Sequence, residues 1–187
     1  MSTAHTRPKQ PELVRRALLD CAARLAAEQG LAGLTVQAVA DAAGVTKGGF
    51  FHHFPSKQAL IDAVFADLVA HFDGEVEALM AADPEPFGRF TRAYVEATFR
   101  ERLLGRAAPS TIMSLSMLAD PELRLVWSRW FEGRMAQHAE TDASPVLEIA
   151  RLAADGLCLN GLLSLDSTVI ADIEALRAEL AALTRPR

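Results

Sequence analysis

The sequence predicts an all-α protein of about nine helices. Apolar residues recur three and four positions apart through most of the 187 residues, which is the spacing of one face of an α-helix. Alternating runs of β-branched residues, which would indicate strands, are absent from the sequence. Helix-start and helix-stop residues also divide the chain into segments of helical length. We therefore expect two helical domains, over residues 1–56 and 57–187.

Composition places the chain among ordinary globular proteins. Half of the residues are hydrophobic and 23% are charged, and a chain of this length can bury a core without disulfides or metal. Cys21 and Cys158 lie far apart inside apolar segments, so we expect two reduced core residues. Neither a signal peptide nor an apolar run of membrane-spanning length is visible, and the expected protein is cytoplasmic, with no membrane partner.

Local signals define four helices in the first eighty residues. The first ends at Gly30, a natural helix stop, and Thr35 stands at the N-cap position of a second, short helix. Gly44 ends that helix, Thr46 opens another short one, and Ser56 caps a long fourth helix. The four expected helices cover residues 11–29, 36–43, 46–54 and 56–80.

Five further helices are expected in the C-terminal part. Two of them follow Asp-Pro-Glu sequences at 83–85 and 120–122, where aspartate serves as the N-cap and proline occupies the first helical position. Pro145 opens another. The five expected helices cover residues 87–103, 110–118, 121–138, 145–165 and 169–183.

The segment 34–60 carries the strongest functional pattern. Two helices too short to be stable alone are joined by Gly44-Val45, which is the arrangement of a helix-turn-helix. In that motif the second helix presents its N-terminal end to base edges in the major groove of DNA. Here that end carries Thr46, Lys47, Gly48 and Gly49. Each glycine costs a helix interior about 1 kcal/mol relative to alanine, which indicates a close approach of the backbone to another molecule.

Aromatic residues and histidines follow the two glycines. Helical spacing puts Phe50 and Phe54 on the core face, and it puts Phe51 and His52 on the outer face. An exposed aromatic ring and an imidazole beside a lysine suit a groove lined by phosphates and thymine methyl groups. A capped, partly buried corner with two hydrogen-bonded histidines fits the same residues equally well.

Charge is distributed unevenly along the chain. Residues 1–60 carry seven lysines and arginines against four aspartates and glutamates, a net charge of +3. Residues 61–187 carry twelve against twenty, a net charge of −8, so the whole chain has a net charge of −5. A basic head on an acidic body agrees with DNA binding by the N-terminal part.

The segment 34–60 resembles the DNA-binding signature of the tetracycline-repressor (TetR) family. The residues that carry the resemblance are Thr35-Val36, Val39-Ala40, Ala43-Gly44-Val45, Thr46-Lys47-Gly48, Phe54, Ser56-Lys57 and Leu60. The expected first helix also fits the family's opening helix, so the similarity extends over residues 13–65. The rest of the chain resembles the family only in the number and order of its helices.

The resemblance implies a set of DNA contacts. Thr35 would cap the second helix and contact a phosphate, and Lys57 would anchor the DNA backbone. Phe51 stands where the family usually has a tyrosine whose hydroxyl binds a phosphate, so only apolar contact is expected from it. The implied DNA-binding residues are Thr35, Thr46, Lys47, Gly48, Gly49, Phe51, His52 and Lys57.

The last two helices form the expected dimer surface. The helix over 145–165 is apolar nearly all round and must be buried on two sides, of which packing within one chain covers only one. In the resembled family these two helices pair with their symmetry mates in a four-helix bundle. The expected dimer residues are Leu152, Leu159, Leu163, Ile173, Leu176 and Leu180.

Large apolar side chains of the middle helices are the candidates for a small-molecule site. Such sites are lined by apolar and aromatic groups with a few polar ones, and Asn160 is the polar residue expected to orient a ligand or cross the dimer seam. The expected ligand-binding residues are Phe90, Tyr94, Met113, Met117, Trp127, Trp130, Phe131 and Asn160. Few charges among them predict a neutral or weakly polar hydrophobic effector. The alternative is that these side chains are ordinary core residues.

The sequence offers no pattern of catalytic or metal-ligating residues. It has neither a nucleophile-elbow serine nor a glycine-rich phosphate loop. His52 and His53 are adjacent, so on a helix they point about 100° apart and cannot chelate one metal ion together. We therefore expect no enzyme, no metal site and no cofactor.

These observations together predict a homodimeric transcriptional repressor. Its partners would be a pseudo-palindromic operator in double-stranded DNA, a second copy of the chain and a small-molecule effector that releases the DNA. The alternative is a helical ligand-binding or scaffold protein with weak, non-specific DNA binding.

Overall fold

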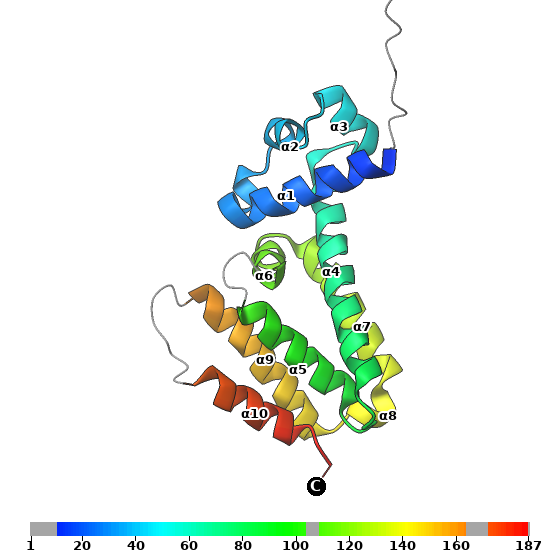
Figure 1. The fold of residues 1–187 in the computed structure, drawn as a ribbon, viewed down its shortest axis with the longest axis vertical. Helices are drawn as coiled ribbons and strands as arrows, with labels where there is room; N and C mark the ends of the chain where they lie inside the picture. Colours follow the sequence, from blue (N-terminus) through cyan, green and yellow to red (C-terminus); the bar gives the residue numbers. More distant parts are fainter. Residues whose placement is uncertain (1–10, 104–108, 164–171, 187) are drawn as a thin grey trace, which may run out of the picture. The chain divides into compact units, whose positions relative to one another are not determined.

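A computed structural model describes residues 11–103, 109–163 and 172–186 of the chain. These residues form α-helices and no strand (Figure 1), which confirms the predicted all-α fold. The helices are α1 (Pro11–Gly33), α2 (Val36–Ala42), α3 (Lys47–His53), α4 (Lys57–Ala82), α5 (Arg89–Leu103), α6 (Pro109–Ala119), α7 (Pro121–Gln137), α8 (Ala139–Asp142), α9 (Pro145–Leu163) and α10 (Ile173–Leu183). The single turn α8 is the helix that the sequence patterns did not predict.

The chain divides into two compact units, Met1–Val64 and Phe65–Arg187. We predicted the boundary before α4, between residues 56 and 57, whereas the division falls inside this helix. The first residues of α4 belong to the first unit, where Leu60 and Val64 are buried.

The first unit is a small bundle of α1, α2, α3 and the start of α4. Its most deeply buried side chains are Leu18, Ala22, Leu34, Val39, Phe50, Phe54 and Leu60. The guanidinium of Arg15 lies over the ring of Phe54, 5.1 Å from its centroid. Gly30 has a φ of 71°, which interrupts α1 at the predicted helix stop. The predicted core positions of Phe50 and Phe54 are confirmed by their burial.

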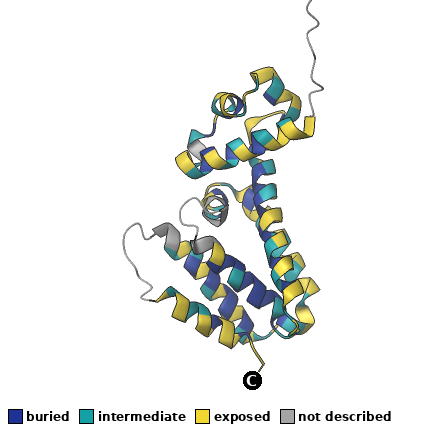
Figure 2. Ribbon diagram, in the orientation of Figure 1, coloured by how far each residue is buried: buried dark blue, intermediate teal, exposed yellow. Residues whose placement is uncertain are grey.

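The second unit is built around α5. This helix packs most extensively on α9 and also on α6, α8 and α10, and Figure 2 shows buried residues gathered along it. Every residue from 90 to 99 is buried except the half-buried Glu96. The apolar core around α5 includes Phe72, Val76, Met80, Ala150, Ala154, Leu157 and Leu180.

Arg92 connects α5 to two other parts of the second unit. Its side chain is only 8% exposed, and its guanidinium donates to four oxygen acceptors. These acceptors are Asp83 Oδ2 at 2.6 Å, the Phe87 carbonyl at 2.7 Å, the Glu85 carbonyl at 2.7 Å and the Thr184 carbonyl at 2.6 Å. Arg92 therefore ties the connection before α5 and the end of α10 to one helix.

Gly88 makes this close packing possible. Its φ is +67°, and a Cβ at this position would lie 2.6 Å from the Thr184 carbonyl oxygen and 3.0 Å from Leu147 Cδ2. Both the backbone conformation and the lack of space require glycine here.

A second buried polar network joins α5, α8 and α9. The backbone N–H of Thr91 donates to Asp142 Oδ1 at 2.8 Å, and the Thr91 hydroxyl donates to the same oxygen at 2.6 Å. Arg151 donates to the Thr91 hydroxyl at 2.6 Å and to the Asp142 carbonyl at 3.1 Å. Each of these polar groups is buried and has a partner, so the network fixes the relative register of the three helices.

Replacing Arg92 by alanine is expected to destabilise the protein strongly. The change leaves the Asp83 carboxylate and several carbonyls without their donor, and breaking a buried ion pair on one side costs about 3–5 kcal/mol. Urea unfolding followed by circular dichroism measures the effect. Arg100→Ala is the control, because that ion-paired arginine is half exposed and its loss should cost less than about 1 kcal/mol. Similar losses in the two variants would contradict the role of Arg92.

The same ion pair predicts a loss of stability in acid. Burial acts to raise the pKa of Asp83, but the hydrogen bond from Arg92 and the one from the Glu85 N–H outweigh it and lower the pKa. A lowered pKa in the folded state adds stability above the unfolded value of about 3.9, and this stability is lost as the pH falls further. The free energy of unfolding should therefore fall more steeply below about pH 4 in wild type than in Arg92→Ala. In the variant, the hydrogen bond that lowers the pKa of Asp83 is absent.

Candidate DNA-binding surface and ligand cavity

The turn between α2 and α3 has the geometry of a helix-turn-helix. The Val45 N–H donates to the Ala40 carbonyl at 2.9 Å and the Gly44 N–H donates to the Asp41 carbonyl at 3.1 Å, which closes α2 in a Schellman motif. Gly44 takes a φ of 66°, as this motif requires. The chain can therefore turn sharply and begin α3 at Lys47, with only Val45 and Thr46 between Gly44 and the helix.

Threonine caps both helices of the motif, as the sequence predicted. The Thr35 hydroxyl accepts a hydrogen bond from the Ala38 N–H at 3.0 Å. The Thr46 hydroxyl accepts one from the Gly49 N–H at 3.1 Å. These caps satisfy backbone donors at two helix N-termini and leave each threonine exposed at the start of its helix.

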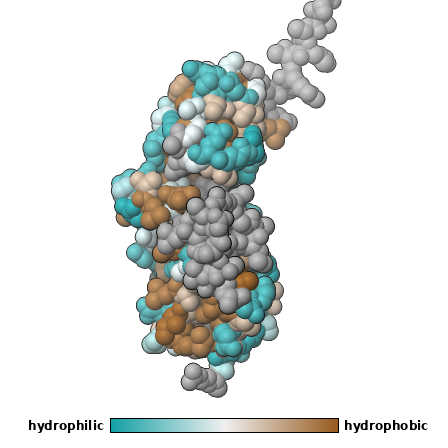
Figure 3. Space-filling view, turned by 90° about the vertical axis from the view of Figure 1, so that its left-hand side faces the viewer, coloured by the Kyte–Doolittle hydropathy of each residue, from teal (hydrophilic) through white to brown (hydrophobic). Residues whose placement is uncertain are grey.

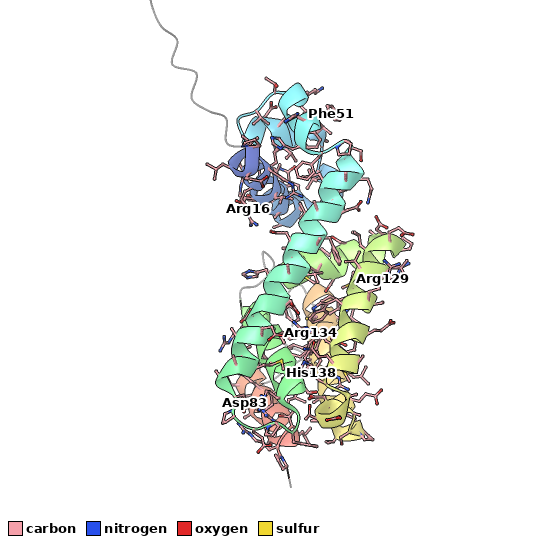
Figure 4. The ribbon with its side chains drawn as sticks, turned by 90° about the vertical axis from the view of Figure 1, so that its right-hand side faces the viewer. Arg16, Phe51, Asp83, Arg129, Arg134 and His138 are labelled. Carbon is pink, nitrogen blue, oxygen red and sulfur yellow. The ribbon has the colours of Figure 1, made fainter. Side chains whose placement is uncertain are left out.

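The outer face of α3 is exposed, and its inner face is buried. Phe51 is 50% exposed, and Figure 4 shows it on α3 in the first unit. Lys47, His52 and Lys57 are exposed as well. The exposed imidazole of His52 favours the outward-facing interpretation over a buried corner. The two histidine rings lie edge to face, 5.2 Å apart.

The two glycines of α3 are not explained by packing within the chain. A Cβ at Gly48 would lie no closer than 3.8 Å to the atoms around it, and one at Gly49 no closer than 3.5 Å. Alanine fits at both positions and is the better helix former. At Gly48 and Gly49, therefore, no side chain covers the helix backbone, on a surface that includes Lys47 and Phe51.

The second unit contains a cavity of about 340 Å³. Four helices contribute most of its wall, namely α5, α6, α7 and α9, and Phe72 is added from α4. The lining residues are Phe72, Tyr94, Thr98, Met113, Ser114, Met117, Leu118, Arg124, Trp127, Ser128, Asp155, Cys158 and Leu159. The size is within the range of sites for small organic molecules.

Half of the expected ligand-binding residues line this cavity. Tyr94, Met113, Met117 and Trp127 are part of its wall. Phe90, Trp130, Phe131 and Asn160 are not. Phe90 is fully buried and stacks on His138, with 5.3 Å between ring centroids. Phe131 packs against the same core, so these two rings take the alternative role of core residues.

Trp130 lies outside the cavity because an acidic residue on α4 holds it. The indole N–H of Trp130 donates to Asp73 Oδ1 at 2.6 Å, and Arg134 Nε donates to the same oxygen at 2.7 Å. Arg134 also pairs with Glu77. These contacts attach α7 to the part of α4 that belongs to the second unit (Figure 4).

Polar lining residues were missed at the sequence level. Asp155 is the most informative of them, because it is the charged residue in a stretch of α9, residues 152–163, that is otherwise uncharged. A charge in such a helix is a signal that could have found it. The others are Thr98, Ser114, Arg124, Ser128 and Cys158, whose place in the wall depends on how the helices pack.

Asp155 and Tyr94 form a polar pair in the cavity wall. The Tyr94 hydroxyl donates a hydrogen bond to Asp155 Oδ1. Burial raises the pKa of Tyr94 well above its usual value, and the nearby Asp155 charge raises it further, so Tyr94 remains a hydroxyl donor. Burial also raises the pKa of Asp155, against the opposing effects of the Tyr94 hydrogen bond and the charge of Arg151. Asp155 is exposed at the wall of this open cavity.

The expected dimer residues divide into exposed and buried ones. Leu152 is 62% exposed, and Leu159 and Ile149 on the same helix are also exposed. Figure 3 faces the side on which α9 and α10 lie, and it shows apolar side chains there on the second unit. Ile173 and Leu176 are half-buried against the chain's own core, and Leu180 is buried in it. The side chain of Leu163 lies outside the described residues.

Comparison with known proteins identifies the class of the protein. Residues 18–64 match the bacterial regulatory proteins of the tetR family, and residues 88–185 match the Tetracyclin repressor-like C-terminal domain. The chain belongs to the TetR family of regulators, which confirms the resemblance and the helix-turn-helix.

Individual relatives show how far the similarity extends. The HTH-type transcriptional repressor KstR2 of Mycolicibacterium smegmatis is 32% identical over 88 residues, 47% of this chain and 43% of that protein. KstR2 of Rhodococcus jostii is 39% identical over 83 residues, 44% of this chain and 38% of that protein. The matched segment thus spans less than half the length of these relatives.

Solved structures match over nearly the whole chain. The multidrug binding protein EbrR, complexed with imidazole, has a TM-score of 0.67 and 25% identity, over 100% of this chain and 98% of that chain. A TetR-family member from Streptomyces coelicolor has a TM-score of 0.70 and 25% identity, over 92% and 99% of the two chains.

The described residues contain neither a metal-binding cluster nor a membrane-spanning helix. Within these ranges, no three His, Cys, Asp or Glu side chains come together as a group able to hold a metal ion. No described helix combines the length and the apolar character needed to cross a membrane.

Gly48→Ala is expected to stabilise the folded protein by up to about 1 kcal/mol, because the added methyl group meets open space and alanine favours the helix. Urea denaturation measures this difference. Gly44→Ala is the matched control in the same motif and should destabilise by about 1 kcal/mol or more, since its φ is positive. A loss of stability in Gly48→Ala would show that the glycine has a role inside the chain.

Proposed function

We propose that this chain is a ligand-responsive transcriptional repressor that acts as a homodimer. The observation that carries the proposal is the presence, in one TetR-family chain, of an exposed helix-turn-helix surface and a separate aromatic-lined cavity. The first suits double-stranded DNA and the second suits a small-molecule effector. The named repressor relatives support the same function.

The proposed DNA surface is the exposed face of the first unit. The N-terminal end of α3, with Lys47 and the bare backbone of Gly48 and Gly49, would enter the major groove. Thr35, Thr46 and Lys57 would contact phosphates from the starts of α2, α3 and α4. Phe51 and His52 would face the groove, where a phenyl ring contacts thymine methyl groups and carries no hydroxyl for a phosphate.

The proposed dimer surface is the exposed apolar face of α9, together with α10. A single helix-turn-helix contacts few base pairs, and dimers solve this by reading two half-sites about 34–36 Å apart. Ile149 and Leu152 of α9 are exposed in the single chain, and so is Leu159, which also lines the cavity. A second copy would remove this apolar surface from water. Leu180 would support the surface from within the core.

The proposed effector site is the cavity in the second unit. The fold neighbour EbrR is described as a multidrug binding protein and has been solved with malachite green and with ethidium. A cavity in the corresponding domain of this chain would take an organic molecule in the same manner. Release of DNA would be a shift between two conformations, limited by the difference in the effector's affinity for them.

Binding to the native operator tests the proposal. Wild type should bind a labelled DNA fragment from upstream of the protein's own gene at least about 10³-fold more tightly than a scrambled fragment, at about 0.15 M salt. Lys47→Ala and Lys57→Ala should each lower the slope of log affinity against log salt by about 0.9. Arg24→Ala is the control, because Arg24 pairs with Glu28 on α1.

Two outcomes would count against this account. Equal, salt-sensitive binding to both fragments would favour a helical ligand-binding or scaffold protein with non-specific DNA binding. Unchanged salt slopes in both lysine variants would show that the assigned phosphate contacts are wrong.

Leu152→Glu is expected to convert the homodimer to a monomer, since it places a charge in the centre of the apolar face. Sedimentation equilibrium should give wild type twice the 20.2 kDa mass of one chain and the variant the single mass. Leu115→Glu changes an exposed leucine on α6 and should remain dimeric. Monomeric wild type, or a dimeric Leu152→Glu variant, would place the interface elsewhere.

A further inference from the structure

The cavity contains an acidic group with little neutralisation by the protein. Asp155 lines the cavity, and its carboxyl accepts one hydrogen bond, from the neutral hydroxyl of Tyr94. Across the described ranges, no lysine or arginine forms an ion pair with it. Arg151, one helical turn away on α9, is committed to Thr91 and to the Asp142 carbonyl. A carboxylate in this position retains the capacity to accept further hydrogen bonds.

Arg124, the cationic residue of the cavity wall, binds carbonyl groups of α6 and does not bind Asp155. Arg124 donates to the carbonyl of Met117 at 2.8 Å, close to the C-terminal end of α6. Its positive charge is thus balanced by carbonyl groups at a helix C-terminus, and the side chain is exposed. Arg124 does not neutralise Asp155 by an ion pair.

Aromatic rings line the same cavity. Phe72 lies edge to face with Tyr94, with 5.7 Å between centroids, and 5.8 Å from the centroid of Trp127. The faces of such rings attract cations, and tryptophan does so most strongly. The acidic body of the chain, with a net charge of −8 over residues 61–187, adds a field that attracts cations.

We propose that the effector is a lipophilic organic cation, an aromatic amine or ammonium compound whose charged nitrogen binds Asp155 while its rings pack among Phe72, Tyr94 and Trp127. This inference rests on the proposed function of the cavity as an effector site. It replaces the neutral effector predicted from the sequence, because the set of residues that predicts a neutral effector does not include Asp155.

A charge series on one hydrocarbon body tests the inference. Diphenylbutylamine, diphenylbutanol and diphenylbutyrate carry an ammonium, a hydroxyl and a carboxylate on the same two-ring frame. Their dissociation constants for the full-length protein, without DNA, can be measured by isothermal titration calorimetry. The amine should bind at least about tenfold more tightly than the alcohol, since a hydrogen bond between charged groups exceeds a neutral one by about this factor, and the carboxylate should bind most weakly.

Asp155→Asn isolates the charge. The amide keeps the size of the side chain and an oxygen for the Tyr94 hydroxyl, so the fold should be retained. The variant should lose about tenfold or more in affinity for the amine and remain within about twofold for the alcohol. Glu179→Gln removes an exposed charge from α10 and should leave all three constants unchanged. Tyr94→Phe keeps the carboxylate and should keep the preference for the amine.

Several results would overturn the inference: equal binding of amine and alcohol by wild type, a preference that survives in Asp155→Asn, or no binding of the amine. Because these titrations contain no DNA, they separate the inference from the proposed function. A protein that binds its operator specifically but shows no preference for the amine refutes only the nature of the effector. A preference for the amine without specific operator binding would refute the proposed repressor function and leave the inference about the effector intact.

Discussion

The burial of α5 is the constraint on which the second unit depends. Packing against α6, α8, α9 and α10 buries Thr91, Arg92 and Tyr94, so the polar groups of these side chains need partners from neighbouring elements. Arg92 finds its partners in the connection before the helix and at the end of α10. Thr91 finds them in Asp142 and Arg151, and Tyr94 finds its partner in Asp155. These pairings admit one register for the helices around α5, because any other leaves buried donors or acceptors unpaired.

The ligand cavity is a consequence of the same arrangement. α5 provides Tyr94 and Thr98 to the wall, and the pairing of Tyr94 with Asp155 determines which face of α9 lies opposite. On the other side, Asp73 holds Trp130 and Arg134, so Trp127 turns to the cavity while Trp130 does not. Space remains because the helices are held by polar contacts at defined positions. A cavity supported in this way is formed before a ligand arrives, and the ligand need not order it.

Local signals allowed the first unit to be predicted almost completely, and they failed where tertiary packing decides. Caps such as Thr35 and Thr46, and a turn such as Gly44, depend on residues two to four positions away, so the sequence contains all the information. The cavity is formed by side chains up to 87 residues apart, from Phe72 to Leu159, and whether an aromatic residue lies in the core or in the cavity wall depends on the residues that it contacts. Leu180 fits the apolar stripe of α10 but is buried in the chain's own core. The contacts between Arg92 and the α4–α5 connection were not predicted from the sequence. The place of Asp155 in the cavity wall depends on how α9 packs against α5, which local sequence patterns do not determine.

A ligand-responsive repressor requires coupling between the cavity and the DNA surface, and thermodynamic linkage tests this coupling most directly. If a cavity ligand releases the operator, the operator must weaken the ligand by the same factor. The measurement is the dissociation constant of one cavity ligand, from quenching of tryptophan fluorescence, for the free protein and for the protein saturated with operator DNA. The dissociation constant should be larger for the complex than for the free protein, by about fivefold or more. This factor should equal the one by which the ligand weakens operator binding. The same constant in both states would show that the cavity does not control the DNA surface.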